Sequence, residues 1–284
     1  MNPIGAHMSV AGGPSRAFQR LEAVGGECLQ IFVKPNVQWT AADLSLEEVR
    51  RFQEEQTRTG VSPVVAHASY LLNLASPDAD LRRRSVLTLA LEIVRAARLG
   101  LPYLILHPGS HQESSLAAGI RRIASGLDQA LKRAAVPEVV LLLETTAGAG
   151  TQIGHRPEHL RDILGHSRNQ PRLGICLDTS HVFAAGFDIS REEEGEKFLE
   201  ELDRQVGLGR LRVVHANDSR TPLGSRADRH THIGEGYLGR GVFARLLHDP
   251  RLAGRPFILE TPKGPAGDES RDAVNIRTLK ELRR

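Results

Sequence analysis

Short runs of β-branched and leucine-rich residues alternate with longer amphipathic stretches along the whole chain. The runs are almost continuously apolar, which is typical of parallel strands that are covered on both faces. We predict strands at residues 4–10, 27–33, 64–70, 103–108, 139–145, 173–179, 211–217 and 256–261. We predict helices at residues 15–24, 46–60, 78–99, 116–135, 157–164, 191–206, 241–247 and 272–282. Eight strand–helix repeats without a linker predict the α/β class and a single (β/α)8 TIM-barrel domain over residues 1–284.

Histidines and carboxylates recur where the predicted strands end. The active site of a TIM barrel forms at the C-terminal ends of its strands, and six consecutive predicted strands finish in such a residue. These residues are His67, His107, Glu144, Asp178, His215 and Glu260. A lone histidine at a strand end is more often a solvated or capping residue, but six matched positions indicate one shared site.

The number and type of these side chains indicate a metal centre. Asp228 and His230 lie two residues apart after the seventh predicted strand, and in an extended segment both side chains point the same way. Asp178 and His181 are three residues apart, so we expect their side chains to diverge and serve different ions unless a turn intervenes. Five histidines and four carboxylates exceed the three protein ligands of one catalytic zinc, and they suit three ions. Imidazole and carboxylate without thiolate favour zinc or manganese over magnesium.

The composition says more about the cellular setting of the protein than about the chemistry it performs. The chain has 37 basic and 34 acidic residues, and this balance says little about partners. Two cysteines exclude a disulfide framework, and neither a secretory signal nor an apolar stretch of about 20 residues is visible. We therefore expect a soluble cytoplasmic protein. Residues 234–239 match G-x-G-x-x-G, but polar residues precede them instead of a strand, so dinucleotide binding is not expected.

Eight segments of the chain resemble those of a known family. They read IGAHMSVAGG, AHASYLLNLA, LHPGS, LLLETTAG, CLDTSHVFAAGFD, HANDS, GSRADRHTHIGEG and ILETP, and they run from Ile4 to Glu260. The sequence is similar to the endonuclease IV family, whose members are zinc-dependent apurinic/apyrimidinic endonucleases of base-excision repair on a TIM barrel. All nine positions that hold zinc in that family carry the expected residue types here.

The resemblance implies a division of these residues among three zinc ions, with Mn²⁺ an alternative in part. It assigns His67, His107 and Glu144 to the first ion, and Glu144, Asp178, His215 and Glu260 to the second. His181, Asp228 and His230 fall to the third, and Glu144 bridges the first two. One position departs from the family: Val37 stands where we expect an arginine before Gln38 and Trp39.

The implied activity is hydrolysis of the phosphodiester 5′ to abasic sites in duplex DNA, which leaves a 3′-hydroxyl and a 5′-deoxyribose phosphate. A metal-activated hydroxide is the expected nucleophile, with Glu144 and Glu260 as catalytic residues. Removal of 3′-blocking groups by the same site is also expected, and so are a monomeric state and a place in the bacterial cytosol.

Two groups of side chains are candidates for DNA contacts. Tyr70 and Leu71 follow His67, and large side chains beside a charged rim favour a wedge that opens a base step, although they could simply cover the barrel. Between residues 204 and 230 there are six arginines and only two acidic residues. We expect Arg226 and Arg229 to contact phosphates, unless this loop is merely a solvated basic segment.

Two other functions remain open at this point. A divalent-metal sugar isomerase of the xylose isomerase-like barrel class has the same fold, but it would leave Asp228, His230 and the arginines unexplained. A protein that binds DNA damage without catalysis predicts the loss of at least one ligand, and no ligand is lost.

Overall fold

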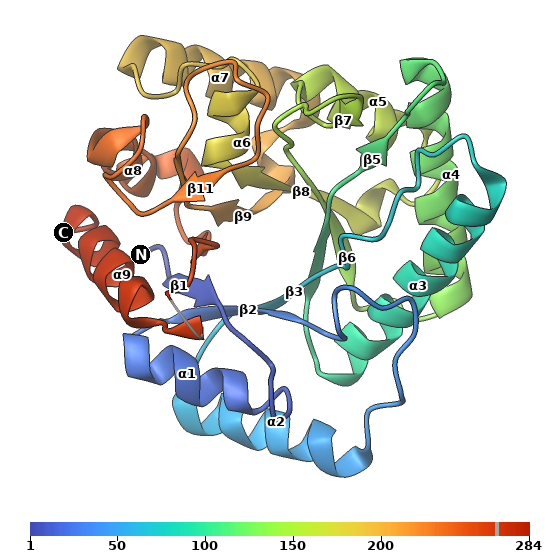
Figure 1. Ribbon diagram of the computed structural model, residues 1–284, viewed down its shortest axis with the longest axis horizontal. Helices are drawn as coiled ribbons and strands as arrows, with labels where there is room; N and C mark the ends of the chain where they lie inside the picture. The colour runs from blue at the N-terminus through green and yellow to red at the C-terminus, as the bar shows by residue number, and fades with distance from the viewer. Residues whose placement is uncertain (265–266) are drawn as a thin grey trace.

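The computed structural model describes residues 1–264 and 267–284, and eight parallel strands in it close into a barrel (Figure 1). Around the barrel the order is β1-β12-β9-β8-β6-β4-β3-β2, and β2 pairs with β1 to close it. The strands are β1 (Ile4–His7), β2 (Cys28–Phe32), β3 (Val64–His67), β4 (Tyr103–Leu106), β6 (Val140–Glu144), β8 (Leu173–Asp178), β9 (Leu211–His215) and β12 (Phe257–Leu259). The predicted TIM barrel is therefore confirmed.

Helices surround the barrel and connect its strands (Figure 1). They are α1 (Arg16–Val24), α2 (Leu46–Thr59), α3 (Ala79–Arg98), α4 (Leu116–Ala134), α5 (Pro157–His166), α6 (Thr179–Ala184), α7 (Glu192–Val206), α8 (Gly239–His248) and α9 (Ser270–Leu282). Short 3₁₀ turns occupy Gln170–Arg172, Leu208–Arg210 and Pro250–Leu252. Ser45 and Glu48 form a capping box that starts α2, and Asp78 caps α3. No helix in the described ranges has both the length and the hydropathy of a membrane span.

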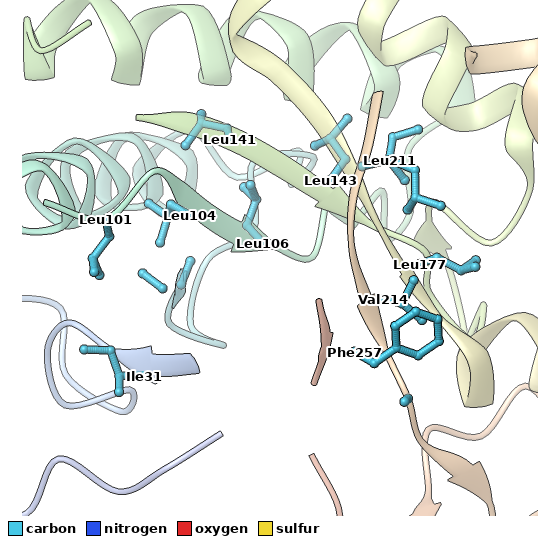
Figure 2. Close-up of a cluster of buried hydrophobic side chains, with 14 of the residues drawn as sticks. Ile31, Leu101, Leu104, Leu106, Leu141, Leu143, Leu177, Leu211, Val214 and Phe257 are labelled. Carbon is cyan, nitrogen blue, oxygen red and sulfur yellow. The ribbon is translucent and has the colours of Figure 1, made fainter. Parts of the chain in front are cut away.

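The strand alternation divides the buried residues into two sets. Outward-facing residues such as Leu141 and Leu143 belong to the core between the barrel and its helices (Figure 2). Inward-facing residues form a separate apolar cluster, which we call the floor of the barrel. The floor consists of Cys28, Val65, Ile105, Leu142, Cys176, Val213 and Ile258. Because side chains alternate along a strand, the residue two positions beyond each floor residue also points inward, one layer closer to the C-terminal rim.

All eight predicted strands are longer than the observed strands, and most of the difference lies at the rim. The first predicted strand ran to residue 10, whereas β1 ends at His7. Beyond the barrel strands the chain turns into two small ladders. One ladder pairs β5 (Gly109–Ser110) with β7 (Gln152–Ile153), and the other pairs β10 (Asp218–Ser219) with β11 (His230–Thr231). These ladders and α6 were not predicted, because segments of two to six residues carry too little hydrophobic pattern to be recognised.

Candidate metal centre

The layer above the floor is polar on every strand of the barrel. One residue comes from each strand, and seven of the eight stand two positions after a floor residue. The layer consists of His7, Gln30, His67, His107, Glu144, Asp178, His215 and Glu260. Six of these residues were predicted from the strand ends, and the structure brings all six together. Helix α6 adds His181, and the segment after β10 adds Asp228 and His230, at its edge.

Glu144 lies at the centre of the layer, fully buried. Its Oε2 atom lies 3.1 Å from Nε2 of His67 and 3.1 Å from Nε2 of His107. Its other oxygen, Oε1, lies 3.0 Å from Nδ1 of His215 and 3.4 Å from Nδ1 of His181. The two oxygens of one carboxylate therefore face two different sets of ligand atoms, which is the geometry that a bridging carboxylate requires.

Asp178 and His181 lie together, because a helical turn intervenes between them. Helix α6 begins directly after Asp178, whose Oδ1 accepts a hydrogen bond of 2.8 Å from the backbone N–H of His181. This helical turn brings Nδ1 of His181 to 3.8 Å from the same Oδ1. The expected divergence had one stated exception, an intervening turn, and the chain turns at the last residue of β8.

Asp228 and His230 meet His181 from the loop between β10 and α8. Oδ1 of Asp228 lies 3.1 Å from Nε2 of His181 and 3.4 Å from Nε2 of His230. The two Nε2 atoms are 3.4 Å apart. Extended backbone at His230, in β11, thus directs both loop side chains to one point, as the spacing of two residues predicted.

Asp218 fixes this loop, and the glycine motif of residues 234–239 takes part. The buried Asp218 carboxylate accepts hydrogen bonds from the backbone N–H groups of Gly234 at 2.9 Å, Gly236 at 3.1 Å and Leu238 at 2.9 Å. A Cβ on Gly236 would lie 2.4 Å from Oδ1 of Asp218, so only glycine fits there. The motif therefore binds a carboxylate of its own chain.

The imidazole rings are oriented by groups on their far side. In three of the rings, Nδ1 donates to a backbone carbonyl. His67 donates to the carbonyl of Ala68 at 2.7 Å, His181 to that of Thr145 at 2.8 Å, and His230 to that of Glu260 at 3.2 Å. A carbonyl only accepts, so Nδ1 of each ring carries a proton, and Nε2 is the nitrogen that faces the polar layer. Metal-binding histidines are characteristically held in this way.

Gln30 orients the fourth ring and was missed in the sequence. Its Oε1 accepts from Nε2 of His215 at 2.8 Å, which directs Nδ1 of that ring to the carboxylates. Its Nε2 donates to Oε1 of Glu260 at 2.6 Å and lies 3.0 Å from Nδ1 of His7. Amides were not considered as site residues, but the position of Gln30, two residues after the inward-facing Cys28, could have identified it.

Asn217 is a second site residue that the sequence did not indicate. Its Nδ2 donates to Oδ2 of Asp178 at 2.7 Å, and its Oδ1 accepts from the backbone N–H of Glu260 at 2.8 Å. This side chain therefore joins the end of β8 to the end of β12. It fixes one carboxylate directly and the other through its backbone.

Neighbouring histidines keep the carboxylates of the layer ionised. Burial opposes the charge on Glu144, but His107 and His215 outweigh burial and hold the pKa of Glu144 well below its usual range. Burial likewise opposes the charge on Asp228, and the hydrogen bond with His181 lowers the pKa of Asp228 to about 2. Both groups are anions at neutral pH, which is the state that binds metal ions.

The clustered donor side chains suit metal binding. Within the described chain, three groups of side chains have ligand atoms that all lie within 4.8 Å of one another. They are His67, His107 and Glu144; Glu144, Asp178, His215 and Glu260; and Asp178, His181 and His230. The first two groups coincide with two predicted sets, and the third contains Asp178 where Asp228 was predicted, although Asp228 contacts both histidines of that group.

The predicted DNA contacts surround the polar layer. Tyr70 is 58% exposed, and its ring centroid lies 5.3 Å from that of His67. Tyr70 and the half-buried Leu71 line a cavity of about 230 Å³ that also contains His67 and His107. Arg226 and Arg229 are exposed on the loop that carries Asp228. Val37 is 73% exposed, so an apolar side chain stands in solvent at this position.

A profile of the family described as the xylose isomerase-like TIM barrel matches residues 18–282. The class defined by this fold and its polar layer is therefore that of the xylose isomerase-like barrels. Several solved sugar epimerases share the fold, among them a D-tagatose 3-epimerase-like protein with 21% identity and a TM-score of 0.72 over 99% of this chain and 96% of that one. Identity this low shows the fold alone.

Closer relatives define the family within that class. A protein of Chloroflexus aggregans named "Probable endonuclease 4" is 47% identical over 99% of this chain and 98% of its own. One of Trichlorobacter lovleyi with the same name is 42% identical over 98% of this chain and 99% of its own. The crystal structure of endonuclease IV from Thermus thermophilus superposes with a TM-score of 0.87 and 40% identity, over 99% of this chain and 98% of that one. The chain belongs to the endonuclease IV family.

Proposed function

We propose that this protein hydrolyses the phosphodiester 5′ to abasic sites in duplex DNA and leaves a 3′-hydroxyl and a 5′-deoxyribose phosphate. The observation that supports this most strongly is the convergence of five histidines and four carboxylates on one rim, with Glu144 between two sets of ligand atoms. Relatives named for endonuclease activity match the chain over nearly its whole length.

Three zinc ions fit the donor set, with Mn²⁺ an alternative in part. His67, His107 and Glu144 would hold the first ion, and Glu144, Asp178, His215 and Glu260 the second. The third would lie among His181, Asp228 and His230, with Asp178 in reach of the same place. When bound, such ions lower the pKa of water and neutralise the charge of the scissile phosphate.

The side chains of the layer position the reaction and hold its protons. Glu144 has no exposed surface, whereas the side chain of Glu260 is 12% exposed and lies nearer to solvent. Burial opposes the charge on Glu260, but His215 and His7 outweigh it and keep its pKa below its usual value. We therefore assign acceptance of the proton of the attacking water to a carboxylate oxygen of Glu260, and the central positioning role to Glu144.

Damage recognition is assigned to the rim. Tyr70 and Leu71 would enter the base stack, because an abasic step lacks one base and is the least costly step to open. Arg226 and Arg229 would contact the phosphates that flank it. A blocked 3′ terminus presents the same kind of phosphodiester to the same residues, so the removal of 3′-blocking groups is part of the proposal.

The sugar isomerase alternative has less support from the arrangement of the site. It left Asp228 and His230 without a role, and both side chains lie against His181 in the polar layer. The alternative of a protein that binds damage without catalysis required a lost ligand, and all nine ligand positions converge.

Incision of a duplex with a single abasic site tests the proposal. The labelled strand should be cut 5′ to the site, and chelation followed by dialysis should abolish cutting until zinc or manganese is restored. Elemental analysis of the untreated protein should give about three metal ions per chain. Turnover of ketoses to aldoses without incision of DNA would overturn the proposal, and so would full activity of a metal-free protein.

A further inference from the structure

A cavity of about 580 Å³ lies outside the barrel, between α3 and α4. Five arginines line it, and none of the described residues around it is acidic. We call this cavity the arginine groove, after Arg82, Arg83, Arg121, Arg122 and Arg133. Figure 1 shows the two helices side by side, with α5 between α4 and α7. Nothing in the proposed reaction uses this surface.

Two of the arginines are held in place by neutral groups. Nη1 of Arg82 donates to the backbone carbonyls of Ser76 and Pro77, both at 2.7 Å. Nη1 of Arg122 donates to Oγ of Ser114 at 2.7 Å. Because these partners carry no charge, they fix the guanidinium groups without neutralising them, and the positive charge stays available to a ligand.

The other three arginines are exposed and nearly free of carboxylates. Arg83 lies 3.5 Å from Asp80 in a pair that is exposed on both sides, and such pairs contribute little. Arg121 and Arg133 form no ion pair with any described residue. The groove therefore has a high density of positive charge.

The charge of the helices is distributed unevenly around the barrel. Helix α3 contains five arginines and two acidic residues, and α4 contains four basic residues and one acidic residue. Helix α7, in contrast, contains seven acidic and two basic residues. A polyanion on the rim is consequently attracted toward α3 and α4 and repelled from α7.

Only a short segment separates the groove from the polar layer. Leu74 lines the groove, and the preceding residue, Asn73, lines the cavity that contains His67 and His107. This wall is rigid, because Oδ1 of Asn73 accepts from the backbone N–H of Ser110 at 2.9 Å and Nδ2 donates to the carbonyl of Ser110 at 3.0 Å. A DNA strand that leaves the site across this wall enters the groove.

The size of the groove selects the ligand. Arg121 and Arg133 stand 12 residues apart on α4, which is about 18 Å along a helix. A single phosphate cannot contact both, whereas a nucleic-acid strand has a phosphate about every 3.4 Å along the duplex axis. We propose that the arginine groove binds the phosphodiester backbone of duplex DNA beyond the damaged step. This inference rests on the proposed function, because it shares its DNA substrate.

The test compares two charge-matched variants on two lengths of DNA. The groove variant is Arg83→Gln/Arg121→Gln/Arg133→Gln, at three exposed positions that glutamine can occupy without loss of packing. The control variant is Arg168→Gln/Arg277→Gln/Arg284→Gln, which removes the same charge from exposed positions elsewhere. The dissociation constant is measured against salt concentration for a short abasic duplex, a long abasic duplex and a long intact duplex.

We expect the groove variant to bind the long duplexes about tenfold or more weakly at low salt. The slope of log K against log salt should decrease in magnitude by about one for each lost phosphate contact. On the short duplex the groove variant should match the wild type, and the control variant should match it on all three duplexes. An equal loss in both triple variants, or an unchanged slope in the groove variant, would overturn the inference.

A second measurement needs no variant. Arginine-specific chemical modification should be slowed at Arg121 and Arg133 by the long duplex and not by the short one. Equal modification with both duplexes would reject DNA as the occupant, and protection by an acidic peptide alone would assign the groove to a protein partner. Binding of the intact duplex tests the groove independently of incision, so a wild type that fails to cut abasic DNA disproves the proposed function separately.

Discussion

The ammonium group of Lys34 lies 3.1 Å from Oε1 of Glu92, and both side chains are 1% exposed. Lys34 lies in the bend after β2, and its Nζ also donates to the carbonyl of Pro35 at 3.2 Å. Glu92, on α3, accepts from the backbone N–H of Ser69 at 3.2 Å. One buried ion pair therefore connects the loop that contains Val37 with the loop that contains Tyr70.

Replacing one member of this ion pair should lower the free energy of unfolding more than replacing both members. Glu92→Gln leaves the Lys34 charge buried without a counter-charge, so we expect a loss of about 3 kcal/mol in the free energy of unfolding. The double variant Lys34→Met/Glu92→Leu should recover most of that loss, because packed apolar side chains replace buried ions at little cost. Denaturant unfolding measures both. A double variant less stable than Glu92→Gln would contradict this account.

Although its stability is restored, the double variant Lys34→Met/Glu92→Leu should discriminate poorly between abasic and intact DNA. The loop that contains Val37 and the loop that contains Tyr70 are no longer joined in this variant. KM for the abasic duplex should rise more than kcat falls, while the metal content stays unchanged. Glu47→Gln, at an exposed ion pair on α2, is the matched control and should change neither quantity.

Gln30→Leu should weaken metal binding although Gln30 is not a proposed ligand. Without the amide oxygen, His215 has no partner that keeps Nδ1 free, and changes of this kind typically cost 10- to 100-fold in metal affinity. Competition with a fluorescent chelator measures the affinity, and Gln53→Leu, on the exposed side of α2, provides the control. Unchanged affinity would show that the orientation of His215 does not depend on Gln30.

Glu144→Gln should be the most damaging isosteric change in the layer. It removes charge from a carboxylate that faces two sets of ligand atoms, whereas Asp228→Asn affects only the contacts with His181 and His230. We expect a loss of about 100-fold or more in incision and of more than one metal ion per chain. Elemental analysis and single-turnover incision compare the two variants. Equal losses of incision and of metal content in the two variants would contradict the central role of Glu144.

Tyr70→Ala/Leu71→Ala should retain its metals and its fold but lose much of its preference for abasic DNA. Val37 cannot donate a side-chain hydrogen bond, so we expect the rim to depend on these two side chains to hold an opened base step. Binding to abasic and intact duplexes at one fixed salt concentration measures the preference. Wild-type discrimination in the double variant would return both side chains to a covering role.

Glu27 should make the free energy of unfolding of the barrel depend on pH in the acidic range. Burial opposes its charge, but Arg283, the backbone N–H of Ile4 and Lys280 outweigh burial and lower the pKa of Glu27 from 4.5 to about 2. Since the folded-state pKa is the lower one, the carboxylate stabilises the fold above about pH 4.5, and its contribution disappears as the pH falls toward 2.

Glu27→Gln should therefore lower the free energy of unfolding at pH 7 by about 1 kcal/mol, a value that allows for the partial exposure of the group. The difference from the wild type should shrink at pH 3. Denaturant unfolding at the two pH values measures it. A difference that is equal at both would show that Glu27 acts through packing instead of charge.

The sequence predicted the barrel and six residues of the polar layer because both follow from one periodicity. His67 and Glu144 end apolar runs, and a chemically distinctive residue after such a run is visible without a structure. Gln30 escaped because an amide in the same position is not distinctive. The meeting of Asp178 with His181 depends on a single turn of helix, and the loop that positions His230 depends on the buried carboxylate of Asp218; neither leaves a pattern in the sequence.

The inward faces of the strands carry a floor of apolar residues and, two residues later, the polar layer. Packing and chemistry are thereby assigned to different residues of the same strand. A change such as Glu144→Gln leaves Leu142 and its neighbours in the floor untouched, so the reactive layer can be altered one position at a time without removing an apolar contact from the core. Each of the eight strands thus offers one position in the polar layer. New combinations of donor residues can be introduced at these positions while the floor of the barrel continues to fold as before.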